Sequence, residues 1–165
     1  MKKIILKNWQ KLVLSIALCL LAGVVGSIFT NSTMDSWYAS LTKPALIPPS
    51  WVFPVVWTTL YILMGIALYL VWSKKTKNKT EKTKIDFAIV VFGLHLVFNV
   101  LWTFLFFFLK SPIAGLIEII ILWILIFINI LQFSKISKTA TGILIIYICW
   151  ISFATVLNTL VLLLN

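Results

Sequence analysis

Five long apolar segments dominate this sequence, at about residues 12–30, 51–72, 87–109, 112–133 and 140–163. A helix needs about 20 mostly apolar residues to cross the hydrocarbon layer of a bilayer, and each segment meets that length. Charged residues make up only 11% of the chain, whereas soluble domains carry roughly 25%. The segments therefore predict an all-α membrane protein, a five-transmembrane-helix bundle that forms a single domain over residues 1–165.

The first apolar segment follows a basic N-terminus, which is also the arrangement of a secretory signal peptide. Leu18 precedes Cys19 and is too large for a lipoprotein cleavage site, and the segment is long enough to span a membrane. We therefore expect a retained first helix, with cleavage as the alternative.

The lysines are distributed unevenly between the predicted spans. All fourteen basic residues are lysine, and twelve lie in the N-terminal tail, in SKKTKNKTEKTKID after the second span, or after the fourth span. The remaining connections hold Lys43 and Lys110. Cytoplasmic loops of membrane proteins carry an excess of lysine. We therefore predict a multi-pass protein of the cell membrane, with its N-terminus in the cytoplasm and its C-terminus outside. Anionic lipid is the expected partner of this charge, and nucleic acid is not expected.

Polar and aromatic residues recur at helical spacing inside three of the spans, and such residues usually face the interior of a bundle. The three stripes are Trp57, Tyr61 and Gly65; His95, Asn99 and Trp102; and Trp150, Ala154 and Asn158 with Leu157 beside them. If the stripes converge, they form an aromatic pocket with a few hydrogen-bonding groups, which is the usual make-up of a small-molecule site.

Two ionisable residues within the spans leave several interpretations open. His95 could hydrogen-bond across helices to Asn99 or Glu118, contact a ligand, or ligate a metal or haem iron. Glu118 could be a structural partner of a neighbouring helix, or a ligand-binding or proton-handling group. The sequence has no metal-ligand spacing and no acid–base pair or nucleophile set, so we expect no metal site and no required cofactor.

Residues 37–72, WYASLTKPALIPPSWVFPVVWTTLYILMGIALYLVW, resemble the tryptophan-rich sensory protein family, also called translocator proteins or peripheral-type benzodiazepine receptors. HLVFNVLW and YICWISFATVLN extend the likeness, which covers about residues 15–160. The resemblance implies a five-helix bundle, commonly a homodimer. It also implies binding of protoporphyrin, haem and benzodiazepine- or isoquinoline-type ligands. Some bacterial members are credited with light-dependent porphyrin breakdown, and a transport role has been proposed for the family.

The resemblance also implies a set of pocket residues. Matched position by position, they are Trp37, Trp51, Trp57, Tyr61, Asn99, Trp102, Trp150, Ala154 and Leu157. Glu118 falls where the family favours an acidic residue, and His95 falls at a position that varies. The stretch LNTLVLLLN lacks the tyrosine and basic residue of the family's cholesterol motif, which argues against sterol binding there. Ala22–Gly26 and Gly23–Ser27 offer small-residue packing faces, but they do not identify a dimer interface.

The connection between the first two spans is rich in proline and tryptophan. Its prolines are Pro44, Pro48 and Pro49. They remove backbone donors and fix φ, so this segment cannot form a regular helix. We expect a preshaped lid over the outer mouth of the bundle, with Trp37 and Trp51 turned inward. The alternative is an ordinary ordered loop with interfacial tryptophans.

Three functions follow from these features. The leading hypothesis is a membrane protein that binds tetrapyrroles or other flat hydrophobic ligands, as a sensor, sink or carrier. The alternative is an enzyme of light- and oxygen-dependent porphyrin degradation, with Trp57 and Trp150 as the catalytic candidates. A structural or assembly protein without a ligand is the third, but aromatic stripes on different spans favour a pocket.

Overall fold

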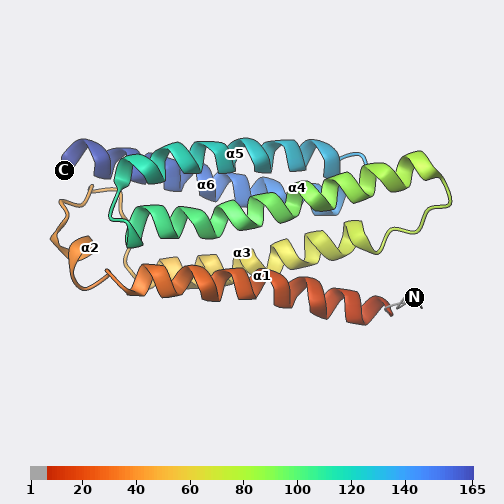
Figure 1. Cartoon of the computed structure of the whole chain (residues 1–165), viewed down its shortest axis with the longest axis horizontal. Helices are drawn as coiled ribbons and strands as arrows, with labels where there is room; N and C mark the ends of the chain where they lie inside the picture. The colour runs from red at the N-terminus through yellow and green to blue at the C-terminus, as the bar shows by residue number, and fades with distance from the viewer. Residues whose placement is uncertain (1–6) are drawn as a thin grey trace.

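The structure is a computed structural model that describes residues 7–165. Its elements are α1 (Asn8–Asn31), α2 (Trp37–Ser40), α3 (Val52–Trp72), α4 (Lys79–Thr103), the π-helical segment η1 (Phe104–Phe108), α5 (Pro112–Phe133) and α6 (Lys138–Leu164). Within the described residues, five helices are long and apolar enough to cross a membrane, with η1 continuing α4. Figure 1 shows them running side by side along the length of the molecule. The predicted all-α, five-helix fold is confirmed.

The ends of the helices follow from local capping. The Ser111 side chain accepts a hydrogen bond from the Ala114 N–H, and Pro112 occupies the first turn of α5, where its missing N–H costs nothing. Ser137 caps α6 in the same way. As a result α5 has the predicted bounds, and α6 departs from them by only a few residues.

The third span was predicted to begin at about residue 87, but helix α4 begins at Lys79, inside the lysine-rich segment. The Asn78 side chain accepts hydrogen bonds from the first turn of α4 and so caps a helix that starts well before residue 87. An ion pair of 2.8 Å between Lys82 and Asp86 then supports one exposed face. Hydropathy located the part of α4 that lies in the membrane, but this helix continues past it.

Helix α1 packs mainly along α3 and α4, while α6 contacts α5 and α3. The contact with α3 depends on Gly65, where an added Cβ would lie 2.5 Å from the Ile16 Cα. Gly23 faces the Tyr61 ring, and Gly26 faces Thr103. The small residues of α1 therefore serve contacts within the chain, and they leave the expected homodimer without an assigned interface.

The connections divide between the two ends of the bundle. Figure 1 shows the α3–α4 and α5–α6 connections at the same end as the start of α1, whereas α2 and the C-terminus lie at the other end. The predicted lysine-rich and lysine-poor connections thus lie at opposite ends. Lys2 and Lys3 of the basic tail lie outside the described residues.

Candidate functional site

A cavity of about 490 Å³ lies at the end of the bundle that carries α2. This volume is within the range of roughly 300–1,000 Å³ that is typical of small-molecule pockets. The lining comes from α1, α3, α4, η1, α6 and the α1–α3 connection, and α5 contributes nothing. Predicted site residues on this lining are Trp57, Tyr61, Trp102, Trp150, Ala154, Leu157 and Pro48. The structure therefore brings Trp57 and Tyr61 of the second-span stripe together with the fifth-span stripe, whereas Gly65 packs against Ile16 of α1.

The walls of the cavity present aromatic surfaces from three helices. On α3, Trp57 stacks on Tyr61 with the ring centres 5.7 Å apart. Trp102 of α4 stacks on Phe106 of η1 at 5.2 Å, and Trp150 adds an indole from α6. Such rings offer large flat contact areas to a planar ligand.

The orientation of Trp102 is fixed by hydrogen bonds between helices. Its indole N–H donates to the Asn158 Oδ1 at 3.2 Å, and the Asn158 Nδ2 donates to the Pro112 carbonyl at 2.8 Å. Asn158 therefore connects α4 to α6 and the start of α5. Both of its polar ends are already used within the protein.

Asn99 was predicted as a pocket residue, but the structure places it behind the wall. It is buried and does not line the cavity. The Tyr61 hydroxyl donates to the Asn99 Oδ1, and the Asn99 Nδ2 donates to the Tyr147 hydroxyl at 2.7 Å. Asn99 thus joins α3, α4 and α6, and its position supports the orientation of Tyr61 in the wall.

His95 and Glu118 are also buried away from the cavity. The His95 ring lies between Phe92, at 4.4 Å, and Tyr147, at 5.8 Å. Neither side chain has a hydrogen-bond partner among residues 7–165, so the expected bond from His95 to Asn99 or Glu118 is not formed. The position of His95 also does not suit ligation of a haem iron in the cavity. In the described part of the chain, no three His, Cys, Asp or Glu side chains gather as metal ligands.

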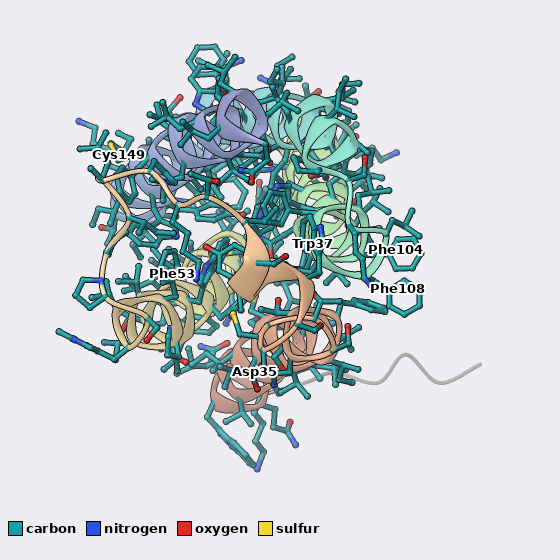
Figure 2. All side chains as sticks on the ribbon, turned by 90° about the vertical axis from the view of Figure 1, so that its left-hand side faces the viewer. Asp35, Trp37, Phe53, Phe104, Phe108 and Cys149 are labelled. Atoms are coloured by element: carbon teal, nitrogen blue, oxygen red, sulfur yellow. The ribbon has the colours of Figure 1, made fainter. Side chains whose placement is uncertain are left out.

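The α1–α3 connection covers the cavity, but not with the side chains expected of a lid. Trp51 is 67% exposed, so the expectation that it turns inward was wrong. Trp37 packs edge-on against Phe106 at 5.7 Å, outside the lining. Figure 2, which looks onto this end, shows the connection crossing the bundle, with Trp37 near the middle. The lining residues from this connection are Met34, Tyr38, Lys43, Ile47, Pro48 and Ser50. Pro44 is buried and Pro49 is exposed.

Segment η1 supplies wall residues that the sequence did not predict. A π-helical turn is wider than an α-helical turn and is frequent at functional sites. Here Phe106 and Phe107 line the cavity, while Phe104 and Phe108 point outward (Figure 2). The run FLFFF is uniformly apolar, so no periodicity distinguished its inner residues from its outer ones.

Comparison with known proteins agrees with this architecture. Residues 15–164 match the TspO/MBR family. The chain is 43% identical to the tryptophan-rich protein TspO of Chlorobaculum tepidum, over 96% of this chain and 98% of that protein. It is 35% identical to the human translocator protein, over 81% of this chain and 78% of that protein. It is 29% identical to the tryptophan-rich sensory protein of Cereibacter sphaeroides, over 92% of this chain and 89% of that protein. This multi-pass membrane protein belongs to the TspO/MBR family.

Proposed function

We propose that this protein binds tetrapyrroles such as protoporphyrin or haem, together with other flat hydrophobic molecules, in the cavity beneath the α1–α3 connection. The observation that carries the proposal is the convergence of Trp57, Trp102 and Trp150, from three different helices, on one cavity of about 490 Å³. Each aromatic pair with a planar ligand contributes about 0.5–1.5 kcal/mol beyond area burial. Three such surfaces favour a ring system over a flexible chain.

A role as sensor, sink or carrier fits this site better than hydrolytic chemistry. The lining contains no Asp, Glu or His side chain among the described residues, and Lys43, its charged residue, has no nucleophile–base partner set beside it. Relatives carry the names sensory protein and translocator protein. We extend to this chain the sensory or translocating role that those names state.

We also propose that the N-terminus lies in the cytoplasm and the C-terminus outside, because the lysine-rich connections flank the end of the bundle where α1 begins. In this orientation the cavity lies near the outer surface. A ligand would then enter or leave on the side away from the cytoplasm.

Titration of the purified protein with protoporphyrin in the dark tests the proposed function. Tryptophan fluorescence and the porphyrin absorption spectrum are followed together. We expect saturable quenching at one porphyrin per chain, and weaker binding in Trp57→Ala and Trp150→Ala. Trp123→Phe is the matched control, because Trp123 lies outside the lining and its indole N–H donates to Ser152 at 2.9 Å. Non-saturable uptake equal to that of empty detergent micelles would refute the proposal.

An illuminated arm of the same experiment separates a binder from an enzyme. For a binder, bound porphyrin bleaches no faster than free pigment in the same detergent. Faster bleaching that disappears in both Trp57→Phe and Trp150→Phe, while binding survives, would instead demonstrate a porphyrin-degrading activity. Phe keeps an aromatic face but is much harder to oxidise than Trp, so the variants separate the two roles.

A further inference from the structure

Lys43 stands apart from the other residues of the cavity. It is the only residue with a formal charge on the lining of the described structure, and the other lining side chains are apolar, aromatic or neutral polar. Its neighbours in the sequence place it on the α1–α3 connection, at the end of the bundle that carries α2 (Figure 1). The charge therefore lies at the mouth of the cavity, where water still reaches it.

No counter-ion neutralises Lys43 within the described residues, where the ion pair present is that of Lys82 and Asp86. The Lys43 Nζ lies instead 5.1 Å from the centre of the Tyr38 ring, within the distance of a cation–π contact. Burial raises the pKa of the Tyr38 phenol above its usual value of 10.0, so this neighbour stays neutral near pH 7. No carboxylate of the described residues therefore competes with a ligand for the Lys43 ammonium group.

The backbone on both sides of Lys43 is held in place. The Thr42 N–H donates to the Asn165 Oδ1 at 2.8 Å, and the Asn165 Nδ2 donates back to the Thr42 carbonyl at 3.1 Å. On the other side, Pro44 is buried and its ring fixes φ. The Lys43 side chain thus extends from a fixed backbone position at the edge of the cavity, although the side chain itself is flexible.

Several other polar groups of the cavity are already satisfied within the protein. Hydroxyl groups of Ser27, Thr30 and Thr103 donate to carbonyls of their own helices, at 2.7, 3.2 and 2.7 Å. The Trp150 Nε1 is buried and has no partner among residues 7–165. An indole N–H can only donate, and a buried donor without a partner is unfavourable. This N–H is not accessible from the cavity, so Lys43 remains the charged donor that a ligand can reach.

We propose that Lys43 recognises a carboxylate, so that the natural ligand is a planar aromatic acid with its anionic edge at the cavity mouth. The ammonium group pairs with the carboxylate, and the ring of the ligand lies against the aromatic walls of the cavity. This inference rests on the proposed function, because it assumes that the cavity is the ligand site. It restricts the ligand class further, since neutral planar molecules lack the group that Lys43 would bind.

A comparison of protoporphyrin with its dimethyl ester tests the role of Lys43. The ester keeps the ring and removes both negative charges. Dissociation constants of both are measured for the wild type, Lys43→Gln, Lys43→Arg and Lys110→Gln. Lys110 is the matched control, because it lies in the α4–α5 connection at the same end of the bundle and outside the lining.

We expect Lys43→Gln to weaken binding of the acid by up to about fivefold, the size of one exposed ion pair, and to leave ester binding unchanged. Lys43→Arg should keep the acid affinity, and Lys110→Gln should change neither constant. The acid and the ester partition differently into detergent. Because each variant is compared with the wild type for the same ligand, this difference cancels. Added salt should reduce the effect, because the Lys43 ammonium is exposed.

Two results would overturn the inference in distinguishable ways. If Lys43→Gln weakens the binding of acid and ester equally, or leaves both unchanged, Lys43 does not recognise the carboxylate. The proposed function still stands in that case. If neither porphyrin saturates the wild type, the proposed function fails together with this inference. Circular dichroism and size-exclusion profiles verify that each variant folds.

Discussion

Asn99 shows how one buried residue holds the wall of the cavity. It accepts from Tyr61 on α3 and donates to Tyr147 on α6, and all three side chains are buried. Hydrogen bonds of this kind matter most when one partner is removed, because the groups left behind stay buried and unpaired. The same residue therefore serves the stability of the bundle and the position of a ring on the cavity wall.

Replacement of Asn99 with Leu should destabilise the protein. The change leaves two buried tyrosine hydroxyls without a partner, and each unpaired group costs about 1–3 kcal/mol. We expect a lower midpoint of thermal unfolding in detergent. The control is the triple variant Asn99→Leu, Tyr61→Phe, Tyr147→Phe, in which no unpaired hydroxyl remains at this place. It should recover much of the lost stability, and a triple variant less stable than Asn99→Leu would contradict this account.

Helical spacing predicted the shared face of His95, Asn99 and Trp102, but not their separate surroundings. Trp102 reaches the cavity, Asn99 bonds to Tyr147, and His95 lies among core side chains. The spacing shows which residues share a face of a helix, but not how deep each lies or which neighbouring helix it meets. Tyr147 gave no signal, because a single tyrosine in an apolar run is also typical of a core residue.

Among the elements, the α1–α3 contact depends on the absence of a side chain at Gly65. A Cβ there would lie 2.5 Å from the Ile16 Cα, a backbone atom that cannot move away alone. We expect Gly65→Ala to destabilise the bundle by about 1–3 kcal/mol, the usual cost of overpacking. Thermal unfolding in detergent measures the effect.

Gly93 provides the matched control for Gly65→Ala. It lies in the middle of α4, and an added Cβ would meet no atom within 4 Å. Gly93→Ala should therefore leave stability unchanged or raise it, by up to about 1 kcal/mol, through better helix propensity. Equal losses in both variants would show that helix flexibility, and not the approach of α1 to α3, is the reason for glycine at residue 65.

The prolines of the α1–α3 connection give a prediction for this element as a whole. Pro48 lines the cavity, and Pro49 beside it is exposed. Replacing both with Gly enlarges the range of open conformations that binding must restrict. We expect weaker protoporphyrin binding with unchanged helix content by circular dichroism. Unchanged affinity would mean that the prolines act in folding or insertion and not in shaping the cover of the cavity.

The bounds of the elements could be predicted where polar caps coincide with the membrane surface. The predicted bounds of α5 were right because the Ser111 cap and Pro112 coincide with the start of the apolar run. At α4 the polar cap and the start of the apolar run do not coincide, since Asn78 caps the helix within the hydrophilic segment. Segment η1 and helix α2 had no recognisable pattern, because tertiary packing of aromatic side chains, and not propensity, accounts for them.

At the scale of the whole molecule, the lysines are unevenly divided between the two ends of the bundle. The five spans of the described residues place the start of α1 and the end of α6 on opposite sides of a membrane, in agreement with their positions in Figure 1. The lysine-rich α3–α4 connection lies at the end where α1 begins, and Lys43 and Lys110 lie at the other. The charge pattern could be read from the sequence alone, because it depends only on the order of the spans. The cavity at the lysine-poor end could not, since it depends on how the loop and η1 pack.

Labelling of single cysteines tests the orientation of the molecule. In a background with Cys19 and Cys149 replaced by Ala, one variant carries Ser36→Cys and another Thr80→Cys. Both positions are exposed, at opposite ends of the bundle. Positively charged connections stay in the cytoplasm during insertion, so an impermeant maleimide should label residue 36 in intact cells and residue 80 only after permeabilisation. Labelling of residue 80 alone in intact cells would reverse the orientation, and the cavity would then open toward the cytoplasm.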